Sequence, residues 1–202
     1  AGTPRVSAQG VYNAAASTYT LTLTQSCTPT AGQGDKEPFV IPVGLGLLGA
    51  DGQDLPLQLI GTPEALPSSG TRTLVLTQAT ETFTFTDITT EPVPSILRGF
   101  SAPVVLTFDY TDAQLLHLLA HDSDAFNRWE AGQRLAVKSA LLAINSVANT
   151  PSIDCRSALN DAYLQAMREV LHHPRLDAAF KELVLTLPSE TYLAEQLDVV
   201  NP

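Results

Sequence analysis

The chain has 202 residues, a formal net charge of −10, and 44% hydrophobic against 16% charged residues. This length can hold one large or two small domains, and the composition is that of a folded globular protein rather than a disordered one. Residues 1–110 and 111–202 each carry a net charge of −5, which argues against a nucleic-acid backbone or an anionic membrane surface as a partner.

The first ten residues, AGTPRVSAQG, lack the apolar stretch of a signal peptide and an initiator Met. We therefore expect the chain to begin inside a longer protein, and no apolar run approaches the roughly 20 residues of a membrane span. Two cysteines, Cys27 and Cys155, do not make a disulfide framework, so we expect reduced, buried thiols. The acidic charge is ordinary for a cytoplasmic protein, which is the location we expect.

Up to residue 110 the apolar pattern has period two. In TYTLTLTQ, Tyr19, Leu21 and Leu23 alternate with threonines, and TFTFTD and VVLTFDY repeat the alternation. This pattern predicts half-buried strands, and clusters such as TPTAGQGDKEP and GTPEALPSSG predict turns between them. RTLVLT and TFTFTD are separated by a short polar break, which predicts a hairpin. We expect residues 1–110 to form an antiparallel, immunoglobulin-like β-sandwich.

The segment EPVPSILRGFSAPVVLTFDY ends the region of alternation. Its prolines, Pro92, Pro94 and Pro103, mark the starts or edges of strands, where a missing N–H group is tolerated. Arg98 is a lone cation on an apolar run. An ion pair or a snorkelling side chain explains it better than a contact with a substrate.

After Tyr110 the apolar spacing changes to three and four residues, so residues 111–202 are predicted to be the first helices of a solenoid-like helical array. Thr111 and Gln114 have the spacing of a capping box, and a longer helix is expected to open near Ser123 or Asp124. Further helices are predicted in CRSALNDAYLQAMREVLHH, in PRLDAAFKELVLT and after a cap at Ser189. The long helix should bury one face, made of Phe126, Trp129, Gln133, Ala136, Val137, Ala140 and Ile144.

Most motifs that could carry chemistry fail on their context. GLGLLG matches the dinucleotide fingerprint, but turn residues follow it instead of a helix, so we expect glycines packed in or beside a strand. GFSAP lacks the last glycine of a nucleophile elbow. HLLAH places His117 and His121 one helical turn apart, as in zinc hydrolases, but Leu118 stands where those enzymes have a glutamate. Ordinary surface or interface histidines are the interpretation we favour.

The densest polar segment is HDSDAFNRWEAGQ, for which two interpretations stay open. One is a capped amphipathic helix with a solvated face. The other is an interface with another domain, in which Trp129 and Arg128 are anchors. The candidate interface residues are Arg98, His121, Asp124, Arg128, Trp129 and Glu130.

Four stretches, AGTPRV, PVPSILRGFSAPV, HDSDAFNRWEAGQ and LTLPSETYLAEQLDVVNP, resemble consecutive landmarks of bacterial aminopeptidase N, the zinc-dependent alanyl aminopeptidases. The resemblance covers the whole chain. It implies a parent with an N-terminal β domain, a thermolysin-like catalytic domain, a small β-sandwich and a large C-terminal helical domain. This chain would be the sandwich and the first helices of the last domain.

The catalytic motifs of that family, Gly-Ala-Met-Glu-Asn and His-Glu-x-x-His, do not occur in this chain. The resemblance therefore implies no catalytic, metal-binding or cofactor-binding residue here, with zinc in the catalytic domain of the parent. The parent would remove N-terminal residues from peptides through a zinc-activated water. This piece, inactive alone, would brace the catalytic domain and help enclose its cavity, and its partners would be that domain and the remaining helices.

Two other hypotheses remain beside this one. The chain could be a self-standing binding module, a sandwich with a helical cap, which should show an exposed aromatic or charged patch. It could also be an enzyme that uses His117 and His121, which stoichiometric bound zinc would reveal. A fragment should instead expose apolar surface on both of its segments.

Overall fold

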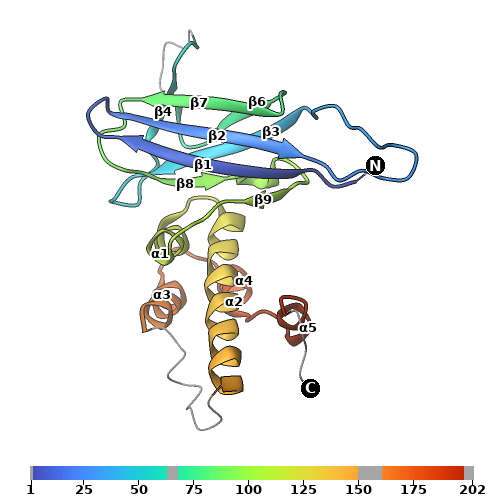
Figure 1. The fold of residues 1–202 in the computed structure, drawn as a ribbon. Coiled ribbons are helices and arrows are strands. Elements are labelled where there is room, and N and C mark those ends of the chain that lie inside the picture. Colours follow the sequence, from blue (N-terminus) through green and yellow to red (C-terminus); the bar gives the residue numbers. More distant parts are fainter. Residues whose placement is uncertain (1, 63–67, 150–160, 198–202) are drawn as a thin grey trace. The chain divides into compact units, whose positions relative to one another are not determined.

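A computed structural model of the chain describes residues 2–62, 68–149 and 161–197 (Figure 1). The chain forms two compact units. The first, which we call the sandwich unit, comprises residues 1–111 together with 121–127; the second, the helical unit, comprises residues 112–120 together with 128–202. Strands therefore give way to helices after residue 110, as the change of period predicts.

Two sheets make up the sandwich unit (Figure 1). The larger has the strand order β5-β4-β7-β2-β1-β9 and the smaller the order β6-β3-β8, and all paired neighbours are antiparallel except β1 and β9. Both sheets contribute to one hydrophobic core. The strands are β1 (Arg5–Asn13), β2 (Thr18–Ser26), β3 (Ile41–Leu48), β4 (Pro56–Leu59), β5 (Ser68–Ser69), β6 (Arg72–Leu76), β7 (Thr80–Thr86), β8 (Val93–Ile96) and β9 (Val105–Thr107).

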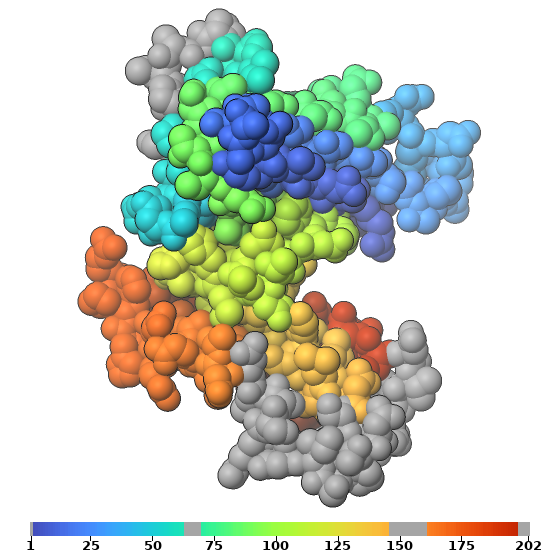
Figure 2. Space-filling model, turned by 60° about the vertical axis from the view of Figure 1, so that its left-hand side comes forward, coloured from blue at the N-terminus to red at the C-terminus, as the bar shows by residue number. Residues whose placement is uncertain are grey.

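The alternation in β2 decides which of its faces is buried. Tyr19, Leu21 and Leu23 are buried in the core, as predicted. The threonines between them face away from the core, and Thr20 Oγ1 lies 3.2 Å from Thr84 Oγ1 on β7. Two more threonine pairs continue this ladder along the strands. The turn between β1 and β2 is exposed and lies at the surface of the sandwich unit, in blue in Figure 2.

The predicted hairpin of RTLVLT and TFTFTD is wrong. β6 pairs with β3, whereas β7 pairs with β2 and β4, so the connection between them crosses from one sheet to the other. Glu81 accepts hydrogen bonds from the backbone N–H groups of Thr77 and Gln78, which shape this crossing. Alternation shows which side chains face the core, but it is the same for a strand of either sheet.

β8 and β9 are edge strands, as the prolines around them predict. Pro94 lies opposite Leu47 of β3, and among the described residues no further strand of this sheet pairs with the other side of β8. β9 lies at the edge of the larger sheet, and Phe108, just beyond it, is buried. The hydroxyl group of Tyr110 donates to the carbonyl oxygen of Pro94 over 2.8 Å, which ties the two seam segments together.

Cys27 is half-buried and free, rather than buried as predicted. It lies just after β2, where the Nζ of Lys36 donates to its Sγ over 3.4 Å. A lysine beside a thiol needs access to water, which keeps this position near the surface. Cys155 lies outside the described residues.

Five helices are described in the helical region, and the predicted cap at Ser189 is confirmed. Ser189 Oγ accepts a hydrogen bond from the backbone N–H of Tyr192, and Asp177 Oδ1 accepts one from Phe180, so both helix starts are capped. In the described part of the chain no helix combines the length and apolar character needed to cross a membrane. The helices are α1 (Asp112–His121), α2 (Ala125–Asn149), α3 (Asp161–His172), α4 (Ala178–Leu185) and α5 (Glu190–Ala194).

The buried face of α2 differs in part from the predicted one. Phe126 and Ile144 are 40% and 39% exposed, whereas Leu135 and the small residues Ala131 and Gly132 are buried. The prediction followed the large apolar side chains. Small residues allow the backbone of a neighbouring helix to approach closely, so they can mark the contact face as well as large ones do.

Candidate functional site

A polar cluster of the sandwich unit surrounds Arg98, which lies in a 3₁₀ turn, Arg98–Phe100, that follows β8. Leu97, Gly99 and Phe100 have φ angles of 65°, 66° and 51°. Such left-handed conformations are costly for residues other than glycine and persist only where surrounding contacts hold them. In this turn the Arg98 side chain is buried in the unit, with 2% of its surface exposed.

The Arg98 guanidinium is bound on several sides by side chains that are distant in sequence. Its Nη2 donates to Asp54 Oδ1 over 2.7 Å and to Asp122 Oδ1 over 2.8 Å. Its Nε donates to Ser95 Oγ over 2.9 Å. Of the two interpretations of Arg98, an ion pair or a snorkelling side chain, the structure shows the ion pair, and it involves two carboxylates.

Gly46 explains how β3 leaves room for this side chain. A Cβ atom at Gly46 would lie 2.1 Å from the Cζ of Arg98, closer than any van der Waals contact. At Gly44, a Cβ atom would lie 2.6 Å from the backbone oxygen of Arg98. Gly44 and Gly46 thus pack within β3, where they allow the close approach of the Arg98 turn, and Gly49 lies just beyond the strand, so the glycines of GLGLLG pack in or beside a strand as predicted.

The connection between α1 and α2 supplies a second layer of hydrogen bonds. Ser123 Oγ donates to Asp54 Oδ2 over 2.7 Å, and the backbone N–H of Asp124 donates to Asp122 Oδ1 over 2.9 Å. These bonds orient both carboxylates toward Arg98. The segment 121–127 therefore belongs to the sandwich unit through its polar contacts, although it connects two helices.

Asp124 and Asn127 complete this layer. Asp124 Oδ1 accepts from the backbone N–H of Asn127, which caps the start of α2, and its Oδ2 accepts from the N–H of Gly99. Asn127 Nδ2 donates to Ser95 Oγ over 2.8 Å. We call the whole group the arginine cluster: Ser95, Arg98, Asp54, Asp122, Ser123, Asp124 and Asn127.

The two carboxylates that bind Arg98 have pKa values shifted in opposite directions. Burial acts to raise the pKa of Asp54, but hydrogen bonds from Arg98 and Ser123 and the charge of Arg98 outweigh it, so this pKa is lowered. Burial raises the pKa of Asp122, and Arg98 offsets this only in part. The Asp122 side chain is fully buried, whereas that of Asp54 is 19% exposed. Among the described residues, Asp122 Oδ2 has no hydrogen-bond partner.

These opposite shifts predict opposite pH dependence for two matched substitutions. Ionised Asp54 stabilises the fold above its unfolded pKa of 3.8, and this contribution is lost as the pH falls through the lowered folded pKa. The contribution of Asp122 is present below 3.8 and is lost as the pH rises through its raised folded pKa. From about pH 3 to about pH 7, Asp54→Asn should therefore become more destabilising and Asp122→Asn less so.

Urea unfolding at several pH values measures this difference, with the exposed substitution Asp35→Asn as the control for a lost surface charge. If the destabilisation by both substitutions changed with pH in the same direction, the pKa values of Asp54 and Asp122 would not be shifted in opposite directions, which would contradict this prediction.

The arginine cluster fits a structural role better than a chemical one. Arg98 donates to at least three internal acceptors, and the hydroxyl of Ser95 already accepts hydrogen bonds from Arg98 and Asn127. A guanidinium held in this way has little capacity left for a substrate. The cluster joins β8, the Arg98 turn, the α1–α2 connection and the loop that carries Asp54.

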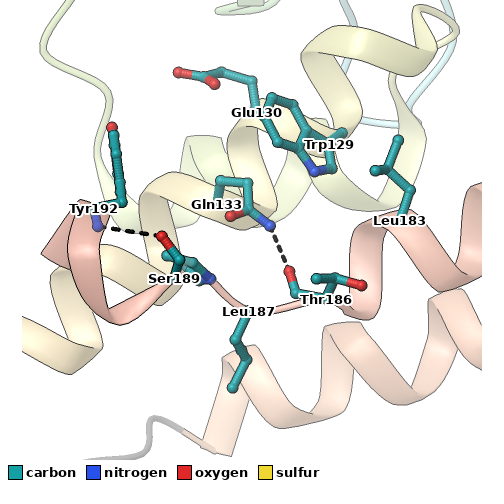
Figure 3. A pocket seen from close by; sticks show the side chains of 9 residues that line it. Trp129, Glu130, Gln133, Leu183, Thr186, Leu187, Ser189 and Tyr192 are labelled. Atoms are coloured by element: carbon teal, nitrogen blue, oxygen red, sulfur yellow. Dashed lines mark hydrogen bonds between the residues drawn. The ribbon is translucent and has the colours of Figure 1, made fainter.

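A second feature, in the helical unit, is a pocket of about 340 Å³ between α2, α4 and the segment leading into α5 (Figure 3). The amide of Gln133 closes one side by donating to the carbonyl oxygen of Thr186 over 2.8 Å. Burial raises the pKa of Glu130, and the charge of Arg134 offsets this only in part. The lining residues are Trp129, Glu130, Gln133, Leu183, Thr186, Leu187, Pro188, Ser189 and Tyr192.

Four of the six candidate interface residues belong to one of these two features, whereas Arg128 and His121 belong to neither. Arg98 and Asp124 belong to the arginine cluster, and Trp129 and Glu130 line the pocket. Arg128 is buried in the helical unit, where its guanidinium donates to the carbonyl oxygens of Leu119, over 2.7 Å, and Ala120. These carbonyls end α1, where a cation is favourable. The interface role of the six residues stays a prediction.

The two histidines of HLLAH differ in solvent exposure: His117 is half-buried and His121 is exposed. A Cβ atom at Gly52 would lie 2.4 Å from the Cγ of His121, so this ring packs directly on a turn of the sandwich unit. In the part of the chain that the structure describes, no group of three or more His, Cys, Asp or Glu side chains is placed to hold a metal ion.

Sequence reasoning missed Asp54, Asp122 and Ser95 as partners of Arg98. Asp54 lies 44 residues before Arg98 and Asp122 lies 24 residues after it. The one available signal was the isolated cation on an apolar run, since a buried guanidinium needs a carboxylate somewhere. That signal predicts a partner without identifying it.

Comparison with known proteins matches each of the two units to a protein family. Residues 2–109 match the model of a family described as a domain of unknown function (DUF3458) with an Ig-like fold. Residues 112–202 match the model of DUF3458_C, a domain of unknown function with ARM repeats. These descriptions agree with a β-sandwich followed by a helical array, which confirms the predicted fold class.

Similar proteins include aminopeptidase N from Escherichia coli, 34% identical over 201 residues, and from Caulobacter vibrioides, 41% identical over 202 residues. Each alignment covers 100% of this chain but only 22% and 21% of these relatives, so the chain spans about a fifth of their length. A crystal structure of Legionella pneumophila aminopeptidase A in complex with aspartic acid is 25% identical, with a TM-score of 0.73, and covers 100% of this chain and 20% of that one. The chain therefore belongs to the DUF3458 family and is homologous over its whole length to a segment of aminopeptidase N.

Proposed function

We propose that this chain is a non-catalytic segment of a zinc-dependent aminopeptidase that removes N-terminal amino acids from peptides. The observation that carries the proposal is the alignment of the whole chain with about a fifth of aminopeptidase N. The motifs His-Glu-x-x-His and Gly-Ala-Met-Glu-Asn are absent from the chain. The acidic composition favours a cytoplasmic location for the parent.

The residues of this chain do not fit a catalytic zinc site. His117 and His121 have the spacing of two zinc ligands, but Leu118 replaces the glutamate that would act as the general base. No further described side chain completes a set of three ligands. The zinc would therefore be bound by the part of the longer polypeptide outside this chain.

The role that we assign to the segment is to brace the catalytic domain and to help enclose its cavity. Exposed apolar side chains in both units support this, because exposed apolar surface that forms a patch marks sites of contact with other domains or proteins. In the sandwich unit the exposed rings of Phe100 and Phe126 pack edge to face, with centroids 5.3 Å apart. In the helical unit Leu183, Leu187 and Tyr192 are each about half exposed or more.

An activity assay tests the proposal directly. The full-length protein that contains this chain should hydrolyse an alanyl anilide, lose this activity to a chelator and regain it with zinc. The 202-residue chain alone should show none. His117→Gln and His121→Gln in the full-length protein should retain activity, because neither histidine would bind zinc. Turnover by the isolated chain after purification with a chelator, or an inactive full-length protein, would contradict the proposal.

A further inference from the structure

Among the described residues that line the pocket of the helical unit, Glu130 is the one with an acidic side chain. It is half-buried, and no ion pair joins it to a described residue. The charge acting on it comes from Arg134, one turn further along α2, and this does not compensate for the loss of water around the carboxylate. The pocket therefore presents a partly desolvated negative charge.

The rest of the lining suits a long side chain with a positive end. Trp129 and Tyr192 contribute aromatic rings, and Leu183 and Pro188 contribute apolar surface. In Figure 3 the Glu130 carboxylate and the Tyr192 hydroxyl group reach toward the same side of the pocket. Aromatic faces attract ammonium and guanidinium groups, while apolar surface packs against the aliphatic part of the same side chain.

We infer that this pocket binds the side chain of an arginine or lysine carried by the part of the polypeptide outside this chain. The inference rests on the proposed function, because it requires a longer protein whose other domains cover this segment. About four fifths of the length of the aminopeptidase N relatives lies outside the region that this chain matches, so the polypeptide has ample sequence to supply the residue.

Charge complementarity selects a basic residue as the occupant. A domain that covered the pocket would remove the remaining water from Glu130. Burying an unpaired carboxylate costs several kcal/mol, whereas a carboxylate paired with a hydrogen-bonded cation is tolerated. An apolar or acidic side chain at this position would leave that cost uncompensated. The chain itself has an excess of acidic residues, so attraction to a basic surface extends beyond the pocket.

Trp129 is the single tryptophan of the chain and lies in the pocket, which makes it a local reporter. With 5-fluorotryptophan in the 202-residue chain, N-acetylarginine amide and N-acetyllysine amide should shift the fluorine resonance in a saturable manner. N-acetylcitrulline amide, which has a neutral group on a similar stem, should bind about tenfold more weakly. Glu130→Gln should abolish the preference for cations, and Glu182→Gln, at an exposed position of α4 outside the lining, should retain it.

The same titration of the full-length protein tests the source of the occupant. The Trp129 resonance, assigned by its loss in Trp129→Phe, should no longer respond, because the intramolecular side chain already fills the pocket. A response as strong as that of the isolated chain would show a pocket open to free peptides and would overturn the inference. So would equal binding of citrulline and arginine derivatives by the isolated chain. A full-length protein that lacks peptidase activity, but whose pocket is closed, would refute the proposed function and leave the assigned occupant standing.

Discussion

Replacing Arg98 with methionine should lower the free energy of unfolding of the sandwich unit by about 3–5 kcal/mol, the range found when one partner of a buried ion pair is removed. Methionine preserves much of the aliphatic stem but leaves Asp54 and Asp122 without their cation. The Asp122 side chain is fully buried, so water cannot replace the lost bond there. Native-state hydrogen exchange of the β2 and β3 amides measures the change.

Two variants separate the loss of charge pairing from a simple loss of packing. Arg5→Met removes an exposed arginine of β1 and should change stability by no more than about 0.5 kcal/mol. The triple variant Arg98→Met, Asp54→Asn, Asp122→Asn should recover much of the lost stability, since replacing a whole buried ionic group with neutral residues is often tolerated. A single Arg98→Met variant as stable as the parent would show that the arginine cluster does not hold the unit together.

Substituting Gly46 with alanine should destabilise the same unit by about 3 kcal/mol, the upper part of the usual range for overpacking a core. The added methyl group would lie 2.1 Å from the guanidinium carbon of Arg98. A guanidinium at the end of a flexible side chain can normally move aside. This one is held by Asp54, Asp122 and Ser95, so movement would break those bonds. Urea denaturation reports the loss.

A double-mutant cycle identifies the cause of that loss. In an Arg98→Ala background the space above Gly46 is free, so Gly46→Ala should cost much less, with a coupling energy of about 1–3 kcal/mol. Gly44→Ala is the matched control, because its clash is with the backbone oxygen of Arg98, which remains in the Arg98→Ala variant. If the Arg98→Ala background reduced the destabilisation by Gly46→Ala and by Gly44→Ala equally, the whole turn would have moved. The guanidinium would then not be the cause of the clash at Gly46.

The local features of this protein follow from its amino-acid sequence. Alternation in TYTLTLTQ predicts that Leu21 and Leu23 are buried, and the serine before ETYLA predicts the helix cap that Ser189 provides. Pro94 predicts the edge position of β8. Each of these depends on the backbone geometry of a few adjacent residues, so the information is contained in a short stretch of chain.

Two of the sequence stretches that resemble the aminopeptidase N family also contact each other in the structure, which their positions in the sequence do not predict. The seam PVPSILRGF contains the Arg98 turn, and HDSDAFN supplies Asp122, Ser123, Asp124 and Asn127 to it. The two stretches are recognisable as separate landmarks, yet they form one hydrogen-bonded cluster. That joining could not be foreseen from either stretch, because hydrogen bonds between distant segments leave no periodic signal.

Contacts between residues that are distant in the sequence are determined by the tertiary structure. An alternating strand fits either sheet equally well, so TFTFTD pairs with β2 and β4 because of how the whole sandwich assembles. The face of α2 depends on where small residues let other helices approach. Arg98 takes Asp54 and Asp122 as partners from 44 and 24 residues away, since electrostatic attraction and desolvation act through space and depend on which groups the folded backbone brings together.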